Sequence, residues 1–122
     1  DRILFLGEKP VHEMAKWYQA LDLFVAPQRW EGFGLTPLEA MACNVPVVAT
    51  RVGAFEDIVD DGVTGALVDR DDIPSMTATL VDWASDIDRL QQAGEASRAR
   101  VTESFRIQGE ADAITAVYRS LL

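Results

Sequence analysis

The chain of 122 residues has the size of one ordinary domain, and its 48% hydrophobic and 25% charged residues are typical of a folded globular protein. A net charge of −9, with Lys9 and Lys16 as the only lysines, excludes the basic surface with which proteins bind nucleic acids. The single cysteine, Cys43, excludes an internal disulfide and a cysteine-cluster metal site, and no apolar run approaches the roughly 20 residues of a membrane-spanning helix.

Short apolar runs recur through the first two thirds of the sequence. They lack strict alternation, which is typical of strands buried on both faces of a parallel sheet. On this basis we predict strands at residues 2–7, 23–26, 45–50 and 66–68. Pro27 stops the second run, and Pro46 lies near the start of the third, where a missing N–H is tolerated.

The segments between these runs have helical spacing. We predict helices at residues 10–22, 36–43 and 53–59, and a turn at residues 60–65. Strands and helices that alternate with short links predict an α/β domain. We therefore expect a Rossmann-like parallel sheet with flanking helices and right-handed crossovers.

The C-terminal third, from Asp72 onward, has only helical patterns. One apolar stripe consists of Ile73, Met76, Leu80, Trp83, Ile87 and Leu90, and a second of Ile107, Ala111, Ile114, Val117 and Leu121. No internal repeat, low-complexity stretch or linker interrupts the chain, so residues 1–122 are expected to form a single unit.

The loop of residues 28–34 lies between a predicted strand and a predicted helix, at the edge of the sheet where α/β proteins bind ligands. Gly32 and Gly34 allow the backbone to approach a ligand closely, and the following helix directs N–H groups toward an anion. A diphosphate suits this position. Glu31 and Glu39 could then bind hydroxyl groups on either side of it.

Each of these residues also has a purely structural interpretation. Thr36 and Glu39 have the spacing of a capping box with proline at the first helical position, which would engage the Glu39 carboxylate. Glu31 is also explained as a solvent-exposed acid of a loop, and Gly32 and Gly34 are explained as residues that allow a tight turn. The residue pattern alone leaves these alternatives open.

A longer stretch carries a resemblance. Glu31-Gly-Phe-Gly-Leu-Thr-Pro-Leu-Glu39, followed by Ala-Met-Ala and Pro46-Val-Val-Ala-Thr, resembles the signature of retaining glycosyltransferases of the GT-B fold, in glycosyltransferase family 4, also called glycosyl transferases group 1. Further matching positions are Phe5-Leu-Gly7, Asp22-Leu-Phe-Val-Ala-Pro27, Gly53, Asp61-Gly-Val-Thr-Gly65 and Leu67-Val68. The resemblance implies the C-terminal, donor-binding half of a GT-B fold, truncated at its N-terminus.

The same resemblance implies roles for individual residues. Glu31 contacts the donor sugar as the candidate catalytic residue, the backbone of residues 33–35 holds the diphosphate, and Glu39 binds the ribose. The implied donor-binding residues are Gly32, Phe33, Gly34, Leu35, Thr36 and Glu39. The implied reaction retains the anomeric configuration and needs no metal and no cofactor besides the nucleotide-sugar donor.

The substrates follow from a narrower resemblance. Thr-Pro-Leu-Glu-Ala-Met-Ala and the ending Tyr118-Arg-Ser-Leu-Leu are similar to lipopolysaccharide-core mannosyltransferases. This implies a hexose, with mannose favoured, moved from GDP-mannose to a glycan or lipid-linked acceptor that an N-terminal domain binds.

We expect a cytoplasmic location, because the N-terminus lacks the features of a signal peptide, with peripheral contact to the inner membrane as a further expectation.

Three positions depart from the family pattern. Asn44 and Ala54 replace glycines, and Asp57 replaces a glutamate. Asn tolerates the left-handed conformation at a helix end, so Asn44 is expected to be harmless. Ala54 is expected to narrow the donor site if its loop requires positive φ.

The family's phosphate-binding Arg and Lys and its acceptor residues have no counterpart in this chain. Arg29 and Arg51 are the nearest cations, and we assign neither this role. We therefore expect the chain to be a truncated piece that transfers no sugar alone and that can self-associate through exposed surface. The alternatives are a nucleotide-sugar epimerase of similar fold and a non-enzymatic nucleotide-sugar-binding module.

Other conspicuous side chains are assigned no chemistry. His12 has no partner at metal-ligand spacing, and nothing near Cys43 lowers its pKa. Trp30 could stack on a base or sugar, but packing is the favoured interpretation. The cluster of Glu56, Asp57, Asp60 and Asp61 lacks the spacing of a calcium loop and is interpreted as a solvated helix end and turn.

Overall fold

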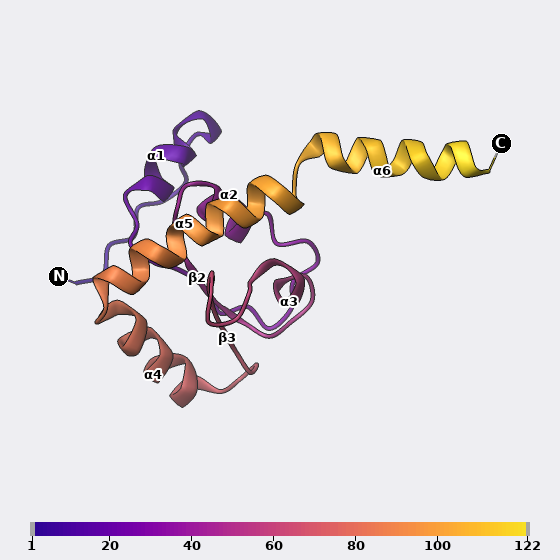
Figure 1. Ribbon diagram of the computed structural model, residues 1–122. Helices are drawn as coiled ribbons and strands as arrows, with labels where there is room; N and C mark the ends of the chain where they lie inside the picture. Colours follow the sequence, from indigo (N-terminus) through magenta and orange to yellow (C-terminus); the bar gives the residue numbers. More distant parts are fainter. Residues whose placement is uncertain (1, 122) are drawn as a thin grey trace.

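The computed structural model describes residues 2–121, which form a three-stranded parallel sheet with flanking helices (Figure 1). The strands are β1 (Phe24–Ala26), β2 (Val47–Thr50) and β3 (Gly65–Val68), in the spatial order β1-β2-β3. The helices are η1 (Val11–Glu13), α1 (Met14–Gln19), α2 (Leu35–Ala42), α3 (Phe55–Ile58), α4 (Ile73–Ala84), α5 (Ile87–Ser104) and α6 (Ile107–Ser120). The predicted Rossmann-like α/β class is confirmed.

The central strand β2 organises the core. Its residues are all buried, and each neighbour pairs with it in parallel, Val25 opposite Val48 on one side and Ala66 opposite Val48 on the other. Because parallel neighbours need a crossover, α2 connects β1 to β2 and α3 connects β2 to β3. Both crossovers leave the sheet at the carboxyl end of one strand and return the chain to the amino end of the next, so the loops that open α2 and α3 lie at the same edge of the sheet.

The two faces of the sheet hold separate hydrophobic clusters, because successive side chains of a strand point to opposite faces. On one face, Val47 and Ala49 pack with residues of α1, α2 and α3, including Tyr18, Met41 and Phe55. On the other face, Val48, Ala66 and Val68 pack with residues of α4 and α5, namely Trp83, Leu90 and Ala93. Trp83 therefore belongs to the core.

The predicted strand at residues 2–7 is wrong. These residues have no regular secondary structure, and Ile3, Leu4 and Phe5 are 74%, 75% and 97% exposed. A strand requires a neighbour for its N–H and C=O groups, and none of the described strands lies beside this segment. The apolar pattern of residues 2–7 is typical of a buried strand, but among the described residues no strand pairs with this segment.

Two other predictions are adjusted at helix ends. The helix predicted at residues 10–22 ends earlier, at Gln19, and begins with a 3-10 turn. The stripe from Ile73 to Leu90 is divided between two helices, because Asp86 accepts a hydrogen bond from the Arg89 N–H and caps the second of them. Asn44 has a φ of 63° directly after α2, which confirms that it ends this helix as a glycine would.

The last helix, α6, forms as predicted but buries no residue. Figure 1 shows it extending away from the rest of the molecule after α5. Its apolar residues Ile107 and Val117 are 86% and 60% exposed, and Leu121, directly after it, is 76% exposed. Among residues 2–121, no helix has both the length and the apolar character needed to cross a membrane.

Candidate functional site

The segment from Glu31 to Glu39 lies at the carboxyl end of β1 and leads directly into α2. Gly34 is the N-cap of α2, with a φ of 82° in the left-handed region. A Cβ at this position would lie 2.6 Å from Cδ1 of Ile58 and 3.3 Å from Cε1 of Phe55. Glycine is required here both for the backbone conformation and because α3 packs directly against it.

The carboxylate of Glu31 is bound by the backbone of its own loop. Its Oε1 accepts hydrogen bonds from the N–H groups of Gly32 at 2.9 Å, Phe33 at 3.2 Å and Gly34 at 3.2 Å. Successive N–H groups that converge in this way form an anion-binding concavity. Two of these N–H groups, those of Phe33 and Gly34, belong to the backbone that the resemblance assigns to the donor diphosphate.

Glu39 contacts a different part of the protein. Its Oε2 accepts a hydrogen bond of 2.8 Å from the hydroxyl of Tyr18 on α1. Burial, followed by this contact with Glu39, raises the pKa of Tyr18 to about 12, so the phenol stays protonated and donates at neutral pH. Tyr18 lies within the helix predicted at residues 10–22, and no local pattern indicated the contact, because the two residues are 21 positions apart.

The capping box predicted from Thr36 and Glu39 does not form. The helix begins at Leu35, so Thr36 is its second residue, and no side chain caps Gly34. Since Glu39 bonds Tyr18 instead, the structural role that competed for this carboxylate is removed. The rest of the predicted geometry, a glycine-rich turn that opens a helix beyond a parallel strand, is confirmed.

The loop after β2 packs closely against the backbone of Glu31. Gly53 has a φ of 50°, and a Cβ there would overlap the backbone oxygen of Glu31. The neighbouring Ala54 has a φ of −63° and ψ of −15°, in the ordinary helical region. The expected restriction from a methyl group at position 54 therefore does not arise from backbone conformation.

An open cavity of about 810 Å³ lies beside α2. Phe33, Leu35 and Glu39 line it, together with Arg106 and the first turns of α6. Its volume is in the range of sites that enclose small-molecule ligands. Three of the predicted donor-binding residues therefore share one concave surface. A smaller cavity of about 380 Å³ at the strand ends contains none of the predicted site residues.

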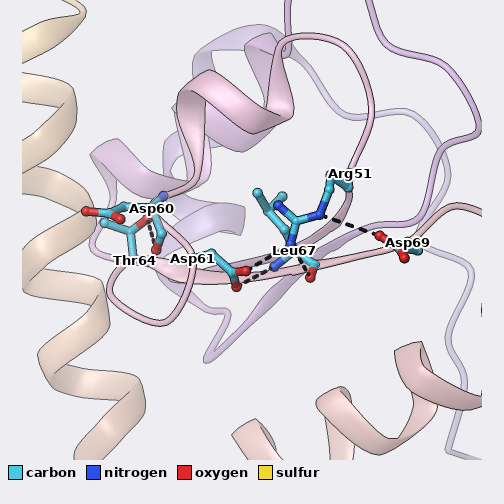
Figure 2. Close-up of polar contacts among 6 residues, drawn as sticks. All are labelled: Arg51, Asp60, Asp61, Thr64, Leu67 and Asp69. Atoms are coloured by element: carbon cyan, nitrogen blue, oxygen red, sulfur yellow. Dashed lines mark hydrogen bonds and ion pairs between the residues drawn. The ribbon is translucent and has the colours of Figure 1, made fainter.

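The two arginines near the loop are already paired with acids. The Arg29 Nε lies 2.7 Å from Oδ1 of Asp71. Figure 2 shows Arg51 between Asp61 and Asp69, at 3.0 and 3.5 Å. The guanidinium groups of both arginines are therefore engaged by carboxylates.

The acidic cluster after α3 also has structural contacts. The Asp61 Oδ1 accepts from the N–H of Leu67 at 3.0 Å, and the Asp60 N–H donates to Oγ1 of Thr64 at 2.9 Å (Figure 2). Asp61 therefore satisfies an outward-facing N–H of the edge strand β3. No group of potential metal ligands occurs among residues 2–121.

The remaining conspicuous side chains have different surroundings, and Trp30 is not buried as the packing interpretation expected. His12 is exposed and lies 3.9 Å from Glu13. Cys43 is half-buried, and burial raises the pKa of its thiol, which disfavours the nucleophilic thiolate. Trp30 is 80% exposed beside Glu31, and Cβ at Gly32 would lie 3.6 Å from its ring.

Comparison with known proteins gives consistent matches. The sequence profile of the family described as glycosyl transferases group 1 matches residues 1–86. The lipopolysaccharide core biosynthesis mannosyltransferases LpsB of Rhizobium meliloti (strain 1021) and LpcC of Rhizobium leguminosarum bv. viciae are 53% and 45% identical over the whole chain. The chain spans only 35% and 34% of their lengths.

A solved structure shares the fold closely. The sucrose-phosphate synthase of Thermosynechococcus elongatus superimposes with a TM-score of 0.91 at 32% identity, over 99% of this chain and 30% of that one. The three-stranded parallel sheet with its helices therefore matches the C-terminal domain of GT-B glycosyltransferases.

Proposed function

The chain belongs to the glycosyl transferases group 1 family, and on this premise we propose that it is the donor-binding part of a retaining hexosyltransferase. The proposed full-length enzyme moves mannose from GDP-mannose to a glycan or lipopolysaccharide-core acceptor. The mannosyltransferase relatives support the sugar and the acceptor class. The proposed N-terminal domain, outside this chain, binds the acceptor.

One observation carries the proposal: the loop that opens α2 already binds a carboxylate oxygen through three backbone N–H groups. A phosphate oxygen has the same requirement for converging donors near a helix N-terminus. We propose that the donor diphosphate takes this position in the complex. Glu31 then leaves the amides and turns to the hydroxyl groups of the neighbouring sugar.

The second carboxylate completes the donor site. Glu39 lies one helical turn further along α2 and lines the cavity beside it. A ribose attached to the diphosphate would offer two hydroxyl donors to this carboxylate, which has acceptor capacity left after binding Tyr18. Sugar, diphosphate and ribose thus follow one another from Glu31 toward Glu39.

In the proposed reaction, the bond between the anomeric carbon and the diphosphate oxygen breaks, and the acceptor oxygen forms the new bond on the same face, while the proton of the acceptor hydroxyl passes to the leaving diphosphate. The backbone N–H groups and the N-terminus of α2 stabilise the negative charge that develops on the leaving diphosphate. Arg29 and Arg51 are engaged by acids, so we propose that further cationic groups come from the rest of the protein. The proposed location is the cytoplasm, with peripheral contact to the inner membrane.

Calorimetry and a transfer assay with the full-length protein test the proposal. We expect GDP-mannose and GDP to bind and mannose to be transferred to a lipopolysaccharide-core acceptor. Glu39→Ala should weaken both nucleotides by about tenfold or more, because both contain the ribose. Residues 1–122 alone should transfer no sugar. Binding without any transfer would instead favour a binding module, and isomerised donor sugar without acceptor use would favour an epimerase.

A further inference from the structure

We propose that Tyr18 is a positioning residue for the donor: its buried hydroxyl holds the Glu39 carboxylate in the orientation that receives the ribose. The inference rests on the proposed function, because it assumes that Glu39 binds the ribose. It adds a residue from a different helix, α1, which lies outside the loop that opens α2. It also explains how an exposed glutamate on a helix surface acquires one fixed orientation.

The contact links a rigid donor to an exposed acceptor. Tyr18 is 5% exposed, and its ring packs in the core cluster 5.9 Å from the ring of Phe24 on β1. Glu39 is exposed, yet its Oε2 lies 2.8 Å from the Tyr18 hydroxyl. A glutamate on a helix surface otherwise samples many rotamers, and ordering it on ligand binding costs side-chain entropy. The bond to Tyr18 orders Glu39 before the ligand arrives.

The geometry leaves the carboxylate available for a ligand. Tyr18 belongs to the core cluster and donates to Oε2, whereas Glu39 also lines the cavity that it shares with Phe33 and Leu35. A carboxylate has about four acceptor positions, so one bond to a phenol leaves room for two ribose hydroxyls. Because the phenol stays protonated at neutral pH, it acts as a donor throughout the physiological range.

The hydroxyl of a buried tyrosine usually has a hydrogen-bond partner, so a purely structural role for this bond has to be distinguished by experiment. The distinguishing quantity is the preference for ribose, given as the ratio of dissociation constants for 2′,3′-dideoxy-GDP and GDP. Loss of core stability weakens the binding of GDP and of its dideoxy analogue equally. Loss of Glu39 orientation weakens only GDP, because the dideoxy analogue has no hydroxyl groups for the carboxylate to bind.

The test uses the full-length protein in calorimetry, with UDP and its 2′,3′-dideoxy analogue as a second pair. We expect wild type to prefer the ribose form about 10- to 100-fold, and Tyr18→Phe to reduce this preference about 5- to 10-fold. In the transfer assay, Tyr18→Phe should raise the donor KM by a larger factor than it lowers kcat. Tyr118→Phe is the matched control, because Tyr118 is 68% exposed on α6.

A double variant tests whether Tyr18 acts through Glu39. In the Glu39→Ala background, adding Tyr18→Phe should change the ribose preference no further. An unchanged preference in a folded Tyr18→Phe protein overturns the inference while the proposed function stands. A wild-type protein that binds GDP and UDP without preferring ribose overturns the proposed role of Glu39 itself.

Discussion

Replacing Glu31 by alanine is expected to tighten the binding of a bare diphosphate, although this residue belongs to the proposed donor site. The carboxylate occupies the three N–H groups that the diphosphate is proposed to use. A diphosphate must first displace this carboxylate. The apparent affinity of wild type is therefore the intrinsic affinity multiplied by the fraction of molecules in which the three N–H groups are free. The Glu31→Ala protein has no carboxylate to displace.

The magnitude follows from the contacts. One hydrogen bond to a charged group contributes about 1.5–3 kcal/mol net. Three donors share a single oxygen in an exposed loop, so we assign the whole set about 1.5–2 kcal/mol, the lower part of that range. This corresponds to about 10- to 30-fold tighter binding of pyrophosphate and GDP by Glu31→Ala. GDP-mannose should gain less, because its sugar loses the contact with Glu31.

Calorimetry of the full-length variants with pyrophosphate, GDP and GDP-mannose measures these ratios. Glu31→Gln keeps an uncharged acceptor for the loop and should fall between wild type and Glu31→Ala. Glu95→Ala removes the same charge from an exposed position on α5 and controls for the change in net charge. If folded Glu31→Ala binds pyrophosphate no better than wild type does, the carboxylate and the diphosphate do not compete for these amides, and the reasoning fails.

Three further predictions concern stability, measured as the free energy of unfolding in urea. Gly53→Ala should cost about 2–3 kcal/mol, because a Cβ overlaps the Glu31 carbonyl. Gly62→Ala, also at positive φ but in open space, should cost only about 1–2 kcal/mol. Equal costs for the two variants would contradict the close approach of Gly53 to Glu31. Asp61→Ala should cost about 1–2 kcal/mol by leaving a β3 amide without its acceptor, and Asp61→Asn, which keeps an acceptor, less than about 1 kcal/mol. The pKa of Tyr18 is raised to about 12, so folding favours the protonated phenol; wild-type stability should be full below about pH 10 and fall between there and pH 12. Tyr18→Phe should lose less stability over that interval.

Local patterns predicted the elements that are buried by their neighbours in sequence. The run at residues 45–50 contains β2, because its β-branched residues are surrounded on both faces and both edges by described elements. The run at residues 2–7 has the same character and forms no strand. The difference between them is the presence of a neighbouring strand, which is a long-range property that no local pattern contains.

The sequence predicted the backbone of the loop that opens α2, but it did not predict the side-chain contacts of the loop and helix. Glycines followed by a helix after a strand specify the turn, and Gly34 does have the left-handed conformation that only such a residue adopts easily. The spacing of Thr36 and Glu39 suggested a capping box with Thr36 as the N-cap, but the N-cap is Gly34, two residues earlier, so Thr36 lies inside the helix. A shift of two residues thus left the Glu39 carboxylate without a capping role, and it accepts a hydrogen bond from Tyr18 instead.

The two glutamates of the motif have equivalent chemistry but different partners in the structure. Glu31 is held by N–H groups of a solvent-exposed loop, and under the proposed function an anionic ligand replaces it there. Glu39 is held by a phenol anchored in the core, and no part of the proposed donor competes for that hydroxyl. Under the proposed function, the first carboxylate moves when the donor binds, and the second keeps the orientation in which it receives the ribose. This assignment requires that Glu31 variants change the affinity for diphosphate, and that Tyr18 and Glu39 variants change the preference for ribose.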